Sequence, residues 1–114
     1  MLQLTPSLLR ASYDFLNHTQ PFNKWNLPDG EDVRFEVVKD KTLRGWYKPD
    51  PHRIGISSSC IGHTTNLILT MAHEMVHLHE KHIGICREDV GHSLAFQRLG
   101  EAVCKVHGFD PKLF

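Results

Sequence analysis

Histidine and glutamate at helical spacing are the residues of this chain that could do chemistry. Residues 73 to 77 read His-Glu-Met-Val-His. At about 100° per residue, His73 and His77 lie one turn apart on the same face of a helix, so both imidazoles can reach one metal ion. Glu74 lies beside that face, where it can hydrogen-bond a metal-bound water without binding the ion itself. The spacing therefore predicts two metal ligands and a general base.

A catalytic zinc ion usually has three protein ligands, so a third ligand should come from elsewhere in the chain. We expect this ligand to be His92, which follows a loop long enough to turn the chain back and comes directly after Gly91. His79 and His82 would lie about 240° and about 180° around the helix from His73. Both should therefore face away from the ion.

Two other residues remain alternatives for the metal shell. Glu101, on the next expected helix, is the reserve third ligand and could instead hydrogen-bond a ligand histidine. Cys86 lies in the loop between His77 and His92, where it could complete the coordination sphere and give an inert structural site. Because an unpaired cysteine is more often a small buried apolar residue, we expect Cys86 to lie outside the shell.

Hydrophobic periodicity and capping residues predict the helices that must position these side chains. A first helix is expected over residues 6–17, after Thr5 as its N-cap. The histidine pair would lie on a second helix, from about residue 65 to His79 or beyond. A third helix should begin near His92 or Ser93 and end at Gly108.

Alternating apolar and polar residues predict three short strands before the second helix. Residues 33–37 and 43–47 are expected to pair as a hairpin, and residues 53–58 to form a third strand. If this third strand lies at the edge of the sheet, its backbone could hydrogen-bond an extended peptide. The expected fold class is α+β, with a small three-stranded sheet packed against an N-terminal helix, the histidine helix and a C-terminal helix.

Length and composition favour one small domain. With 114 residues, of which 40% are hydrophobic, we interpret residues 1–114 as a single domain, expected to be monomeric. Thirteen basic and thirteen acidic residues give a net charge of zero, so no overall field attracts nucleic acid or an anionic membrane.

The sequence has no apolar run long enough for a signal peptide or a membrane span, so a cytoplasmic location is expected. Three dispersed cysteines without a CxxC pair argue against a disulfide framework and against a zinc ribbon.

One basic segment could still contact nucleic acid. Residues 39–53 interleave five lysine and arginine residues with Trp46 and Tyr47. A segment of this composition could bind phosphate and stack a base. Such segments are more commonly solvated hairpins with one packed aromatic residue. Weak contact with DNA is therefore a secondary expectation.

Together these motifs resemble the SprT-like, or Spartan-type, zinc metallopeptidases. The similarity lies in HEMVH, in Gly91 and His92 with Phe96 after them, and in the earlier GWY and IGIS segments, and it covers residues 33–106. The resemblance implies a zincin-like fold. In many relatives a cysteine-rich zinc ribbon or a DNA-binding extension follows the catalytic domain, and the expected absence of such an extension here is a departure from the family. The resemblance also implies hydrolysis of peptide bonds in protein substrates, DNA-associated proteins among them.

The same resemblance implies a role for each residue of the motif. Zinc would be bound by His73, His77 and His92, with Glu74 as the catalytic base. Apart from the resemblance, Tyr47 or another nearby donor is a candidate to stabilise the oxyanion. Two functions compete with the peptidase. One is a catalytically silent zinc-binding module that recognises a protein or DNA partner through the same cleft, and the other is a helical protein without a metal.

Overall fold

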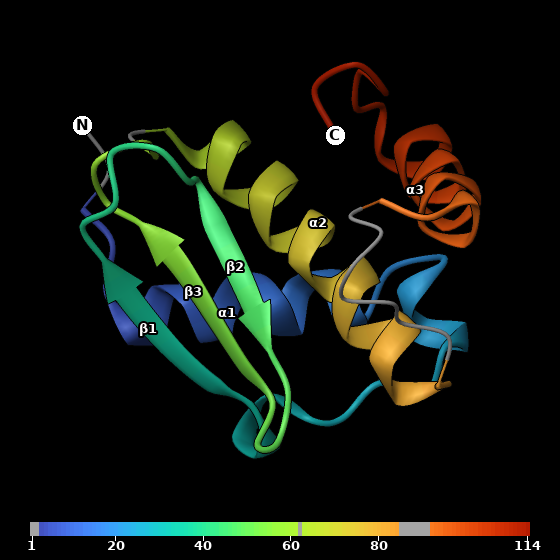
Figure 1. The fold of residues 1–114 in the computed structure, drawn as a ribbon, viewed down its shortest axis with the longest axis horizontal. Helices are drawn as coiled ribbons and strands as arrows, with labels where there is room; N and C mark the ends of the chain where they lie inside the picture. The colour runs from blue at the N-terminus through green and yellow to red at the C-terminus, as the bar shows by residue number, and fades with distance from the viewer. Residues whose placement is uncertain (1–2, 62, 85–91) are drawn as a thin grey trace.

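The first helix forms where its capping residues predict it. In the computed structural model, which describes residues 3–61, 63–84 and 92–114, α1 spans Pro6–Asn17 (Figure 1). The Thr5 hydroxyl oxygen accepts a hydrogen bond of 3.1 Å from the backbone N–H of Leu8, which satisfies one of the free donors of the first turn. The apolar side of α1 is buried against the sheet and α2, through Leu9, Tyr13 and Leu16.

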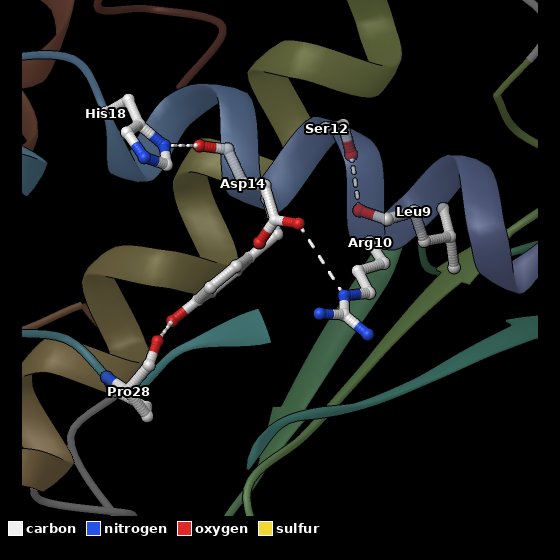
Figure 2. A network of polar contacts seen from close by, with 7 residues as sticks. Leu9, Arg10, Ser12, Asp14, His18 and Pro28 are labelled. Atoms are coloured by element: carbon white, nitrogen blue, oxygen red, sulfur yellow. Dashed lines mark hydrogen bonds and ion pairs between the residues drawn. The ribbon is translucent and has the colours of Figure 1, made fainter. Parts of the chain in front are cut away.

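Polar contacts tie α1 to the loop that follows it. The Tyr13 hydroxyl donates to the Pro28 carbonyl oxygen at 2.6 Å, which joins the helix to a segment fifteen residues later. Figure 2 shows this region, with Ser12 donating to the Leu9 carbonyl oxygen and His18 lying 2.7 Å from that of Asp14. The loop itself contains two short 3₁₀ helices, η1 (Phe22–Lys24) and η2 (Gly30–Asp32).

The sheet has the strand order β1-β3-β2, with β1 at Arg34–Val38, β2 at Gly45–Lys48 and β3 at Arg53–Ser57 (Figure 1). Strand β3 pairs in parallel with β1 and antiparallel with β2. The predicted hairpin between the first two strands is therefore wrong. The physical reason is burial: Ile54 and Ile56 of β3 are fully buried, and the central position removes both from water while satisfying the backbone of β3 on both sides.

The central position of β3 also corrects the expectation that this strand has a free edge for a peptide. The edge next to α2 belongs to β2, which lies beside that helix (Figure 1). Gly45 permits this close approach, because a Cβ atom there would lie 2.8 Å from the Gly55 carbonyl oxygen and 3.1 Å from the methyl group of Thr70 on α2.

The two remaining helices lie where the sequence places them. Helix α2 spans Thr64–His82, and its buried side forms the centre of the core with Met71, Ala72, Met75 and Val76. Helix α3 spans Leu94–His107, capped at its start by Ser93 and at its end by Gly108 in the left-handed conformation, with φ of 74°. The three helices and the mixed three-stranded sheet of the described residues confirm the α+β class.

No helix in the described part of the chain is long and apolar enough to cross a membrane.

Candidate metal centre

Two histidines of α2 and one that lies just before α3 converge in the structure. One ligand atom from each of His73, His77 and His92 lies within 4.8 Å of the other two. Their ring centroids are 5.1 Å apart for His73 and His77, 4.8 Å for His73 and His92, and 5.3 Å for His77 and His92. The predicted convergence of His92 with the pair on α2 is confirmed, and the three side chains are close enough to bind one metal ion.

A single phenylalanine packs against all three imidazoles. Phe96, on the first turn of α3, stacks on His92 with ring centroids 4.2 Å apart and on His77 at 4.4 Å, and it meets the His73 ring at 4.9 Å. Its side chain is only 3% exposed, so its own position is fixed by the core. Phe96 thus limits the orientations that the three rings can adopt.

A backbone contact selects the tautomer of His73. Its Nδ1 lies 2.6 Å from the backbone oxygen of Phe114. Because that oxygen can only accept a hydrogen bond, Nδ1 must be the protonated nitrogen. The Nε2 atom of His73 is then left with a lone pair for a metal ion.

Glu80 supports the second histidine and was missed as a functional residue in the sequence. Glu80 is 2% exposed, with its Oε1 3.4 Å from Nδ1 of His77 and its Oε2 accepting a 2.9 Å hydrogen bond from the Ser93 hydroxyl. Ser93 is also the N-cap of α3 and follows His92 directly. Helical geometry could have found Glu80, because seven residues after His73 it returns to nearly the same face, about 340° around the helix.

Burial sets the protonation states at the centre. Burial lowers the pKa of His73 to about 4, although the contact with Phe114 acts in the opposite direction. Burial also lowers the pKa of His77 to about 4, and the neighbouring histidines are lesser causes. Both imidazoles are therefore neutral at neutral pH, as metal binding requires. Burial also raises the pKa of Glu74, which is 5% exposed, to about 8, so this group keeps its proton at neutral pH when no cation is near.

The histidines and Glu74 line a cleft of about 730 Å³ between β2 and α2. One wall consists of β2 and the residues just before it, and the other consists of α2, and Leu113 and Phe114 also line the cleft. Tyr47 also lines the cleft, but its hydroxyl lies 2.6 Å from Nδ1 of His52. This contact gives no support to Tyr47 as the oxyanion donor.

The alternative ligands are not at this centre where the structure describes them. Glu101 is exposed on α3 and does not belong to the group of converging side chains. Cys86 and Gly91 lie outside the described residues. The reserve role of Glu101 as third ligand therefore gains no support, whereas the prediction for Cys86 stays open.

The other two histidines of α2 have separate partners. His79 is buried and stacks on Trp25, with ring centroids 4.3 Å apart and planes at 9°. His82 is exposed and its ring lies 6.3 Å from that of His52. As predicted from their angles around the helix, neither joins His73 and His77.

Comparisons with known proteins return no match to this chain. No family model matches it, and no curated protein and no solved structure matches it. The assignment of function therefore depends on the residues and geometry described above, and the resemblance to SprT-like peptidases stays a prediction.

Proposed function

We propose that the chain is a zinc-dependent endopeptidase of the SprT-like type with a zincin-like fold. The observation that supports this proposal best is the convergence of three imidazoles beside a buried glutamate in an open cleft. A purely structural zinc site would usually have four protein ligands and little access to substrate. Three histidines facing a cleft match the donor set of a catalytic site better.

The donor set fits zinc among the common metals. Imidazole nitrogen is a ligand that zinc shares with copper, iron and nickel, whereas magnesium and calcium prefer oxygen ligands. Three histidines with a fourth position for water form one of the known catalytic zinc arrangements. His73, His77 and His92 would hold the ion through one ring nitrogen each.

In the proposed reaction, water is added across a peptide bond. The chemistry that zinc supplies when bound in such a site is polarisation of the scissile carbonyl and a lower pKa for water. Glu74 takes the proton from the attacking water and passes it to the leaving amine. The burial of Glu74 suits both halves of this task, because a carboxyl group with a raised pKa holds a proton more readily than an exposed one.

Strand β2 is the proposed site for the substrate backbone. It is an edge strand, it lines the cleft, and it lies beside the helix with the histidine pair. An extended peptide could add to this edge through main-chain hydrogen bonds, which would give binding with little dependence on sequence. Protein or peptide substrates are therefore proposed, and contact with DNA stays a lesser expectation.

The proposal is tested by measuring zinc content and casein cleavage in wild type and in Glu74→Gln. Glutamine keeps the shape and hydrogen-bonding capacity of a neutral carboxyl group but cannot accept the proton. We expect Glu74→Gln to retain zinc and to lose at least about 100-fold in kcat, the usual scale for a general base. His92→Ala should lose zinc and activity together.

Glu36→Gln is the matched control, because Glu36 is exposed on β1, at the opposite edge of the sheet from β2. It should keep both zinc and activity. Zinc retained without cleavage in wild type over many substrates would favour the catalytically silent module. If wild type supplied with excess zinc binds none, the peptidase and the zinc-binding module are both contradicted. That result would favour the third function, a helical protein without a metal.

A further inference from the structure

We propose that the cleft binds acidic peptide segments in preference to neutral or basic ones. The inference rests on the proposed function for its site and names the substrate class for it. Among the described side chains that line the cleft, three are cations, Arg44, Lys48 and Lys81, and one is a carboxylate, Glu74. The chain as a whole has no net charge, so this excess is a local property of the cleft.

Lys81 lies on the same face of α2 as the metal ligands. It follows His77 by four residues and His73 by eight, so the three side chains line up along one side of the helix. Lys81 is half-buried and, within the described residues, forms no ion pair with a carboxylate. Its charge is therefore available to a ligand in the cleft.

Arg44 lies at the opposite end of the cleft. It directly precedes Gly45, whose backbone packs against Thr70, one turn before His73 on α2. Thr70 and Lys81 are eleven positions apart on α2, which is about 16 Å at 1.5 Å per residue. The two cations thus flank the histidines, and an extended segment of about five residues would span them.

The contacts of the aromatic residues favour a peptide over a nucleic acid. The Trp46 ring packs against Gly55, in the space that a Cβ atom there would occupy. The Lys48 ammonium lies 4.5 Å from the centroid of the same ring, over a face on which a base would have to stack. Tyr47 contacts His52 through its hydroxyl and its ring. The strand edge, by contrast, offers main-chain pairing that only a peptide can use.

The test measures binding without cleavage, in zinc-loaded Glu74→Gln. Fluorescence anisotropy would compare an acidic and a basic peptide of equal length with the same apolar residues, and a single-stranded oligonucleotide. We expect the acidic peptide to bind about tenfold more tightly than the basic one at low salt, with the difference shrinking as ionic strength rises. Adding Arg44→Gln and Lys81→Gln should reduce this preference to about twofold, without introducing a new carboxylate near the zinc ligands.

The matched control adds Lys24→Gln and Arg98→Gln, two exposed cations that do not line the cleft, and should keep the preference. Equal affinities for the two peptides, tighter binding of the basic peptide, or a preference that the cleft substitutions leave unchanged would overturn the inference. So would tighter binding of the oligonucleotide than of the acidic peptide. Because cleavage by wild type is measured separately, a peptidase without this charge preference is distinguishable from a chain that binds acidic peptides but cleaves none.

Discussion

At the scale of single residues, the candidate metal centre depends on the groups that contact its histidines as well as on the histidines themselves. His77 has Glu80 at its Nδ1, and His73 has the backbone oxygen of Phe114 at its own. Such outer contacts fix the orientation of a ligand ring and increase its basicity. Glu80 has a second contact, because its other carboxyl oxygen accepts a hydrogen bond from Ser93, the residue that follows His92. This contact joins the start of α3 to α2.

We predict that Glu80→Gln weakens zinc binding while the fold is kept. An amide is less able than a carboxylate to accept a proton shared with the ring, so zinc affinity should fall about 10- to 100-fold. Competition with a chromogenic chelator would measure the change, and circular dichroism would report the fold. Glu36→Gln, at an exposed position, should leave the affinity unaltered. An unchanged affinity in Glu80→Gln would show that Glu80 only packs against the ligand.

The proposed metal ligands could be predicted from the sequence, whereas the groups that contact them could not. HExxH spacing places His73, His77 and Glu74 on one helix by local geometry alone. The contact of His73 with Phe114 depends on how the chain folds back over forty-one residues, which no local pattern encodes. Glu80 is an exception and could have been predicted as well, because helical geometry returns it nearly to the face of His73.

At the scale of elements, the helices were predictable and the order of the strands was not. Thr5, Ser93 and Gly108 mark helix ends through contacts with residues close in sequence. Strand pairing is decided instead by which strand loses most water-exposed apolar surface, and β3 takes the centre for that reason. Strands β1 and β2 consequently form the two edges of the sheet, and the substrate is proposed to bind at β2, which lines the cleft.

The central role of β3 predicts a large cost for truncating its core side chains. Ile56 is fully buried, so Ile56→Ala should lower the free energy of unfolding by about 2–5 kcal/mol. Ile83 is 49% exposed just after α2, and Ile83→Ala should cost less than about 1 kcal/mol. Urea unfolding monitored by tryptophan fluorescence compares the two. Similar losses in both variants would contradict the central burial of β3.

At the scale of the whole molecule, the buried groups of the metal centre make stability depend on pH. His73 and His77 titrate near 6.5 when unfolded and at about 4 when folded, so the unfolded state binds more protons in that range and their contribution rises with pH. Glu74 acts in the opposite sense. Its pKa rises from 4.5 to about 8 on folding, so its contribution falls as pH increases between these values.

The variant Glu74→Gln isolates the contribution of Glu74 to the pH dependence of stability in the zinc-free protein. The variant should have about the wild-type stability near pH 4.5 and become the more stable protein by a few kcal/mol as the pH approaches about 8. The histidine contribution is common to both proteins and cancels in the difference. Urea unfolding across this pH range, with a chelator present, measures the difference in the free energy of unfolding between the two proteins. A difference that does not change with pH would mean that Glu74 is not buried as the structure shows.

X-ray absorption at the zinc edge tests the central claim most directly, because it counts and identifies the atoms around the ion. For the zinc-loaded wild type, we predict three imidazole nitrogens and one further oxygen or nitrogen, all at about 2.0–2.1 Å. A sulfur atom at about 2.3 Å, the distance of a cysteine ligand, or a wild-type shell with fewer than three imidazoles would contradict the proposed catalytic centre.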